Sequence, residues 1–343
     1  GLFDLLVTYA ALLLPLVNWQ LDQGLFRFML DVRDQIDKQT HLFSTVFLIS
    51  IIQSVVFCVL FLIIYPFLTL EHAEFLLYYV ILHIYTAMFL QFARGLGKTS
   101  KYAVASFISA LATVLLNVLA LAVFKLGLKG LFIATISAQV LTIFYLIMAT
   151  KCWIFFSIKA VKFKLFNEVR KYSIPLIPNN LAWWIVNSSD RMVISHFIGI
   201  SANGIFTVAS KFSNVFISFY NVVNLSWTES VSLHINDPDR DSFLSEMMTT
   251  LFKLFASACF GIVACMPFVF PILINEKYVA GYDQILILMY AMLFRVLVGM
   301  YSCIYIATKQ SNKVAITSIA AAVINLAVDL LCINKIGLYA ASV

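Results

Sequence analysis

Charge is scarce in this sequence. Only 12% of the 343 residues are Asp, Glu, Lys or Arg, about half the share expected of a soluble domain. Hydrophobic residues make up 62%, and the mean hydropathy is +0.95. A soluble fold needs polar outer faces, whereas many stretches here are apolar on every side for about the 20 residues that a bilayer requires. The composition therefore excludes an ordinary soluble domain and predicts a chain built from membrane helices.

Signatures of catalysis and metal binding are also missing. The sequence has no Gly-x-x-x-x-Gly-Lys phosphate loop, no nucleophile elbow and no paired-histidine motif. Its six cysteines are scattered without a Cys-x-x-Cys pair, which indicates small buried hydrophobic residues. The net charge of +6 comes from basic residues between the apolar runs, so nucleic acid is not an expected partner. We expect no enzyme, no cofactor and no metal site.

Long apolar stretches bounded by polar residues predict ten complete transmembrane helices. They are residues 2–21, 42–66, 73–92, 103–124, 128–150, 173–198, 203–226, 248–274, 281–307 and 313–334. A partial eleventh begins near Gly337. Lys and Arg favour cytoplasmic loops, and the odd-numbered loops carry fifteen of them against four in the even-numbered loops. This alternation agrees with the ten spans and places the loop 22–41 in the cytoplasm.

A basic segment divides the chain into two halves. Residues 151–172 hold six Lys and Arg and predict a cytoplasmic connector between an N-terminal helical bundle (1–150) and a C-terminal one (173–343). Residues 101–117 align without gaps on residues 313–329, and a Gly-Leu pair follows both copies, which indicates a parallel internal repeat. The expected fold is all-α and polytopic, with two pseudo-repeated bundles that lack a first helix and a C-terminal part. The connector is a candidate for binding anionic lipid headgroups, although a plain topology signal explains the same charges.

Ionisable residues within the predicted spans are concentrated in the second half. A charge inside the bilayer is costly, so each one is a candidate functional residue. The candidates are Asp190, Arg191, Lys211, Lys253, Arg295 and Asp329. Arg191 and Lys211 each lie ten residues from Ser201, the centre of the turn between their helices, and therefore at one depth. Arg295 lies about 21 Å into its span, near mid-membrane.

Two interpretations of these charges are open. In the first, Asp190 or Asp329 neutralises Arg191 or Lys211 and ties the helices together. In the second, surplus cations line an aqueous cavity for an anionic substrate such as a phosphate or diphosphate, which arginine binds bidentately. Both arrangements can hold in one protein.

Three motifs around the sixth and seventh predicted spans resemble a known family. They are Pro175-Leu-Ile-Pro178, Asp190-Arg191 and Gly204-Ile-Phe-Thr-Val-Ala-Ser-Lys211. This series resembles the start of the second half of bacterial polysaccharide-precursor flippases, the O-antigen, capsule and teichuronic type. That family belongs to the multidrug/oligosaccharidyl-lipid/polysaccharide exporter superfamily. The likeness covers most of the chain, although Phe206 stands where the family usually has tyrosine.

The resemblance implies two six-helix bundles with the fold of multidrug exporters (MATE-like), working by alternating access in the bacterial cytoplasmic (inner) membrane. It implies an undecaprenyl-diphosphate-linked oligosaccharide as cargo, flipped from the inner to the outer leaflet during synthesis of surface polysaccharide such as the O-antigen of lipopolysaccharide. H⁺ or Na⁺ as coupling ion, membrane lipids and a polysaccharide polymerase are the further expected partners. In this role Arg191, Lys211 and Arg295 bind the anionic head, while Asp190 or Asp329 holds or releases them.

Three rival functions share parts of this pattern. A peptidoglycan-precursor flippase has the same architecture and also carries an anionic diphosphate. A drug/cation antiporter of the same fold would need acidic residues to dominate its cavity, and here cations do. An integral-membrane polysaccharide polymerase would be an enzyme with a long outer loop rich in basic residues or histidine, and the outer loops predicted here are only a few residues long.

Overall fold

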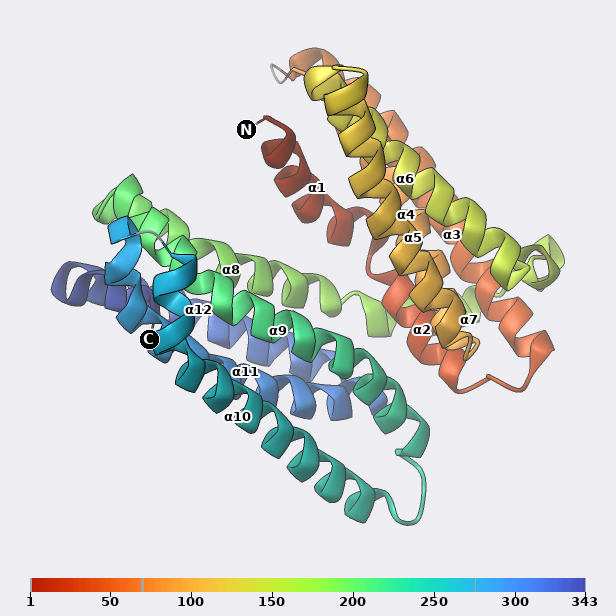
Figure 1. The fold of residues 1–343 in the computed structure, drawn as a ribbon. Coiled ribbons are helices and arrows are strands. Elements are labelled where there is room, and N and C mark those ends of the chain that lie inside the picture. The colour runs from red at the N-terminus through yellow and green to blue at the C-terminus, as the bar shows by residue number, and fades with distance from the viewer. Residues whose placement is uncertain (1, 69–70, 275, 343) are drawn as a thin grey trace. The chain divides into compact units, whose positions relative to one another are not determined.

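The computed structural model describes residues 2–68, 71–274 and 276–342, and all regular structure in these residues is helical (Figure 1). The chain divides into two compact units, residues 1–177 and 178–343. The division falls in the first turn of α8 (Leu176–Phe197). The expectation of an all-α fold is confirmed for the described residues.

The first unit begins with a broken helix. Its helices are α1 (Leu2–Asn18), α2 (Leu21–Leu30), α3 (Ile36–Ile64), α4 (Glu74–Gly95), α5 (Thr99–Val118), α6 (Gly127–Thr150) and α7 (Phe163–Ser173). Between α1 and α2, Trp19 and Gln20 have φ angles of 51° and 54°, and the two helices are bent by 55°. Residues with left-handed backbone angles cannot continue a right-handed helix, so α1 ends before Trp19 and α2 starts in a new direction.

Two hydrophobic clusters hold the first unit together. One lies where α2, α3 and α4 meet and includes the buried side chains of Met29, Phe43 and Phe92. The other includes Leu6 of α1 and Phe75 of α4 and lies toward the opposite ends of the helices. Residues 151–172, the expected connector, fold within this unit, because α7 packs against α2 and α3.

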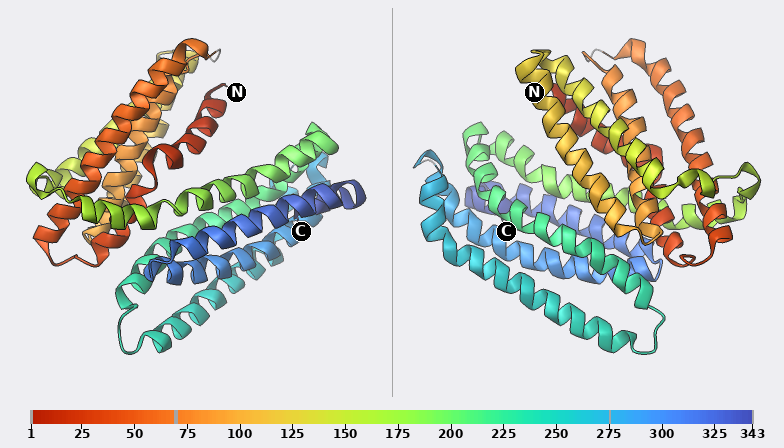
Figure 2. Two further views of the ribbon diagram at one scale, coloured as in Figure 1. Left: turned by 180° about the vertical axis from the view of Figure 1, so that it is seen from behind. Right: turned by 45° about the vertical axis from the view of Figure 1, so that its right-hand side comes forward.

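The second unit consists of long helices that run side by side (Figures 1 and 2). After α8 come α9 (Ile200–His234), α10 (Arg240–Leu273), α11 (Tyr282–Ala307) and α12 (Ser311–Ile336). One cluster of buried side chains forms the core, with Phe216 of α9, Phe255 of α10 and Met289 of α11 among its members. The helices α9 and α11 pack tightly, since a Cβ atom on Gly299 would lie 2.1 Å from the Tyr220 hydroxyl oxygen.

The aligned segments of the two halves share a structural detail. Residues 101–117 lie in α5, and residues 313–329 lie in α12. The glycine that follows each segment, Gly127 or Gly337, has a positive φ angle, 58° and 59° respectively. Glycine adopts such angles at little cost, so the repeated Gly-Leu pair marks the same kind of chain reversal in both copies.

Fewer helices than expected are apolar enough to be assigned as membrane spans. Among the described residues seven helices qualify by length and composition, and an eighth if the bent pair α1–α2 is one span. The expected count of ten is therefore not confirmed. The helices α8 and α9 are long enough but do not qualify, because Asn, Ser and charged residues interrupt their apolar sequence. The bounds also differ: α9 continues to His234, eight residues beyond the expected end at 226.

Candidate functional site

Polar side chains of α8 face α11 and α12 in the second unit. The Ser318 hydroxyl on α12 donates a hydrogen bond of 2.6 Å to Asn179 Oδ1, and the Ser189 hydroxyl donates one of 3.1 Å to Asn325 Oδ1 of α12. Polar side-chain bonds between helices are typical of membrane bundles. These two bonds join α8 to α12, and the ionisable side chains of α8 and of the helices around it form the candidate site.

Two acidic side chains meet in this region. The carboxyl groups of Asp190 on α8 and Asp329 on α12 lie close enough to interact, with Asn325 beside them. Asp329 is 1% exposed, and in the described part of the chain no donor group lies within hydrogen-bond distance of either of its oxygens. Asp190 Oδ1 is also buried without a donor. Two neighbouring carboxylates in a low-dielectric region require a proton or a cation between them.

Arg295 lies on α11, close to α8. Its guanidinium carbon is 4.8 Å from the centre of the Trp183 ring, and Nη1 donates a hydrogen bond of 3.3 Å to Asn187 Oδ1. A guanidinium has five N–H donors in a planar fork that matches carboxylates and phosphates. Within the described ranges no carboxylate pairs with Arg295, so the remaining donors are available to an anionic ligand.

Arg191 and Lys211 are exposed, and neither side chain has an ion pair or hydrogen bond among the described residues. Neutralisation of these cations by Asp190 or Asp329, the first of the two interpretations, is therefore absent among the described residues. The side chains of successive residues on an α-helix point about 100° apart around its axis. Because Asp190 faces α12, the next residue, Arg191, points in another direction. The structure thus brings the two acids together and leaves the cations separate from them.

The first unit contains a set of buried charges that the sequence did not predict. Arg27 and Arg94 were assigned to loops, yet they are only 3% and 4% exposed. The guanidinium of Arg94 stacks on Phe26 at 4.0 Å and donates to Gln91 Oε1 at 2.9 Å. The spacing of Leu21, Leu25 and Met29, four residues apart, could have revealed the helix α2 in the expected loop 22–41. Because these cations have protein partners, we assign them to the architecture and not to the site.

The described residues contain no cluster of three or more His, Cys, Asp or Glu side chains that could hold a metal ion. Two neighbouring carboxyl groups can share a proton or hold a monovalent cation, and the side-chain oxygen atoms of Ser189 and Asn325 lie beside the pair.

Comparison with known proteins identifies the family of the chain. A family model described as polysaccharide biosynthesis protein matches residues 1–227, which is more than half of the chain. Comparison with curated proteins finds no match.

Solved structures of multidrug transporters share the fold. A MATE protein in complex with MaL6 matches 100% of this chain and 82% of its own, with a TM-score of 0.84 and 13% identity. An outward-facing multidrug resistance MATE transporter of the MOP superfamily matches 99% and 81%, with a TM-score of 0.82 and 13% identity. The MATE transporter ClbM in complex with Rb⁺ matches 99% and 81%, with a TM-score of 0.76 and 17% identity. This fold and the apolar helices identify a multi-pass membrane protein.

Proposed function

The chain belongs to the polysaccharide biosynthesis protein family, and on that premise we propose that it is a flippase for lipid-linked oligosaccharides of the multidrug/oligosaccharidyl-lipid/polysaccharide exporter superfamily. The proposed cargo is an undecaprenyl-diphosphate-linked oligosaccharide, carried from the inner to the outer leaflet of the bacterial cytoplasmic membrane. Two six-helix bundles alternate access to the cargo. The product feeds surface polysaccharide synthesis, with a polysaccharide polymerase as the next enzyme.

One observation carries this proposal. Arg191, Lys211 and Arg295 lie on helices of a membrane protein and have no carboxylate partner among the described residues. Cations in such segments are expensive unless they are paired or lie in a water-filled cavity. A diphosphate group that enters the cavity would complete their pairing through charge-assisted hydrogen bonds, and arginine can hold it with two parallel N–H donors. The lipid chain of the cargo stays in the bilayer.

The acidic pair supplies a site for the coupling ion. H⁺ or Na⁺ between Asp190 and Asp329 removes the repulsion between their carboxylates and draws α8 toward α12. Loss of the ion restores the repulsion and favours separation of the two helices, so the ion biases one of two arrangements. The solved ClbM structure contains Rb⁺, which supports cation coupling in a protein of this fold.

A drug/cation antiporter is the second candidate, because the same acidic pair would serve cation exchange and the solved structures include multidrug transporters. A peptidoglycan-precursor flippase would use the three cations in the same way as the main proposal. Export of dyes or drugs by cells that express the full-length gene, without any effect on surface glycan, would favour the antiporter.

The test follows the lipid-linked oligosaccharide in a deletion strain. We expect the intermediate to accumulate on the inner leaflet and the full-length gene to restore surface polysaccharide. Arg191→Ala, expressed at a normal level, should restore it poorly. Arg240→Ala is the matched control, because Arg240 pairs with Asp241 at the exposed start of α10.

One outcome would contradict the role of Arg191, and another would contradict the flippase. Normal polysaccharide with Arg191→Ala would show that Arg191 does not bind the anionic head. Unpolymerised units on the outer leaflet of the deletion strain would indicate a polymerase in place of a flippase.

A further inference from the structure

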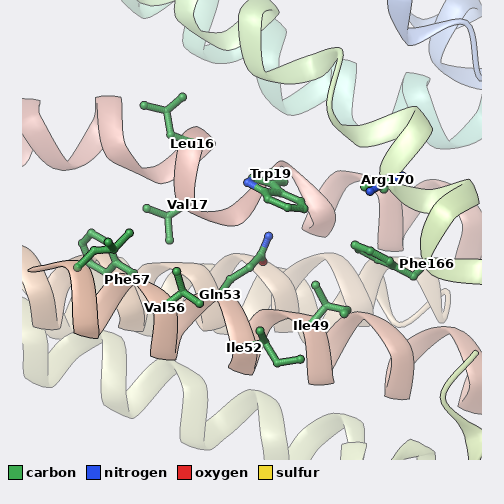
Figure 3. A pocket seen from close by; sticks show the side chains of 11 residues that line it. Leu16, Val17, Trp19, Ile49, Ile52, Gln53, Val56, Phe57, Phe166 and Arg170 are labelled. Atoms are coloured by element: carbon green, nitrogen blue, oxygen red, sulfur yellow. The ribbon is translucent and has the colours of Figure 1, made fainter. Parts of the chain in front are cut away.

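The first unit contains an apolar groove whose function the proposal above does not explain. It has a volume of about 450 Å³ and lies between α1, α3 and α7 (Figure 3). This volume is within the range of about 300–1,000 Å³ that is usual for small-molecule sites. All lining residues belong to the first unit, so the groove is complete within it.

The walls of the groove are hydrophobic and open to the surroundings of the unit. Leu16 of α1 and Ile52 and Val56 of α3 line it and are each about half exposed. Along α3 the lining extends from Ile49 to Leu60, which is roughly 17 Å at the rise of an α-helix. A hydrocarbon chain of a membrane lipid fits such a surface, because both lie within the apolar part of the bilayer.

A polar group interrupts this apolar wall. Gln53 lines the groove and is 9% exposed, and both its amide oxygen and its amide nitrogen are buried without a hydrogen-bond partner. Figure 3 shows the amide pointing from α3 across the groove toward Trp19. A buried amide without a partner is costly, so a ligand with a hydrogen-bonding group at this depth would be favoured.

The positively charged side chain of Arg170 lies at one end of the groove. Arg170 of α7 lines that end together with Phe166, on whose ring it stacks at 5.6 Å. Throughout the described ranges no carboxylate pairs with Arg170. The helix α7 is basic and amphipathic: Val169 and Tyr172 are buried, while its lysines and Arg170 are exposed. Such helices lie in the membrane interface, and basic residues on the cytoplasmic side attract anionic lipid headgroups.

We propose that the groove binds one anionic glycerophospholipid that enters from the cytoplasmic side, with its glycerol backbone drawn in to the level of Gln53. Arg170 holds the phosphate, the Gln53 amide donates to an ester carbonyl oxygen below it, and one acyl chain lies along α3 toward Phe57. Gln53 is one helical turn, about 6 Å, beyond Ile49, which lines the Phe166 end of the groove (Figure 3). A polyprenyl chain has no carbonyl group and would leave the amide unpaired, so the groove favours a glycerolipid over the lipid tail of the cargo.

The bound lipid would have a structural consequence that does not depend on the cargo. It would contact α1, α3 and α7 together, at the bend between α1 and α2, and α7 leads directly into α8. Membrane composition would thereby influence the segment that joins the two units.

Lipid binding to the purified full-length protein tests the proposal. Native mass spectrometry would follow titration with phosphatidylglycerol, with zwitterionic phosphatidylcholine and with undecaprenyl phosphate. We expect phosphatidylglycerol to bind most tightly, and Gln53→Leu and Arg170→Ala each to weaken it about tenfold. Lys164→Ala, which removes a basic side chain of α7 that does not line the groove, is the matched control and should bind normally.

A variant that fills the groove tests lipid binding without disturbing the fold. Val56 is 51% exposed, so Val56→Trp should fold and should block phosphatidylglycerol. Unchanged binding to Gln53→Leu, Arg170→Ala and Val56→Trp would overturn the proposal, and so would preferential binding of undecaprenyl phosphate. Transport of the cargo is measured separately. If the protein still flips its cargo but binds no phospholipid in the groove, only this inference is refuted and the proposed flippase function is not.

Discussion

The two units treat their charged residues in opposite ways. In the first unit Arg27 and Arg94 are almost fully buried and have protein partners, and Asp22 accepts hydrogen bonds from Asn18 and Gln23. In the second unit Asp329 is equally buried, yet neither of its oxygens has a donor among the described residues. Arg191, Lys211 and Arg295 of the second unit are also without carboxylate partners in that part of the chain.

The difference separates charges that stabilise the fold from charges that are kept for a ligand. A partnered buried charge contributes to one arrangement of helices, and removing it leaves its partners unsatisfied. An unpartnered charge costs stability in the free protein, so its retention requires a ligand or an ion that pairs with it. The first unit therefore has a structural charge network, and the second unit has the candidate site.

The largest effect on stability is expected from Arg94→Ala in the first unit. The variant loses the stacking on Phe26 and the bond to Gln91, and leaves other groups unsatisfied, at a cost of about 3 kcal/mol. Thermal unfolding of the full-length protein in detergent should show a clear fall in Tm and in yield. If Arg94→Ala folded with a normal Tm but did not transport, Arg94 would not be a structural charge and the distinction between the two units would be wrong.

The second largest effect is a loss of transport, which we expect from Arg295→Ala. Loss of its charge-assisted hydrogen bonds to the cargo should reduce flipping about 10- to 100-fold, which corresponds to about 1.5–3 kcal/mol. Arg295→Lys should recover only part, because an ammonium cannot form the bidentate contact. The assay is the appearance of surface polysaccharide in the deletion strain, and Tm should change little. Equal losses of Tm for Arg295→Ala and Arg94→Ala would contradict the comparison.

A third prediction concerns the packing around the partnered arginines. A Cβ atom on Gly95 would lie 2.6 Å from Met29, so Gly95→Ala should force α4 from α2 and cost about 2 kcal/mol. Gly261→Ala in α10 is the matched control, because no atom lies within 4 Å of its added Cβ. The control should stabilise slightly, by up to about 1 kcal/mol, since alanine is the better helix former. Similar Tm values for the two variants would refute the tight contact.

The smallest effect on stability is expected from Asp329→Asn. The amide is similar in size and uncharged, so the repulsion from Asp190 disappears and the folded protein should be as stable or slightly more stable. Flipping by the variant, measured in proteoliposomes, should lose its dependence on a H⁺ or Na⁺ gradient. Gradient dependence that matches the native protein would show that another site binds the coupling ion.

Much of the architecture followed from hydropathy, but the charges near helix ends did not. The spans 42–66, 73–92 and 128–150 lie within α3, α4 and α6 or overlap them closely, because long apolar runs leave few alternatives in a membrane. By contrast, Arg27 and Arg94 were expected in loops and are buried. A single sequence does not show which aromatic ring or carbonyl will lie beside a guanidinium.

The sequence predicted which residues belong to the candidate site but not how their side chains are paired. The cost of charge in a bilayer was enough to single out Asp190, Arg191, Lys211, Arg295 and Asp329. It did not decide how they pair: the sequence left open whether an acid neutralises a cation, and the structure placed acid next to acid. Asp190 and Asp329 are far apart in the chain, and the rotation of α8 and α12 about their axes determines which side chains meet.

The sequence by itself determined that this protein is a helical membrane protein with an unusual group of charges in its second half. Hydrophobicity and the cost of burying charge are properties of residues, so they can be read without coordinates. The tertiary structure alone decided that Asp190 meets Asp329, that Arg295 stacks on Trp183, and that Gln53 faces an apolar groove. These relations depend on which helix faces pack together, and packing is a property of the whole fold.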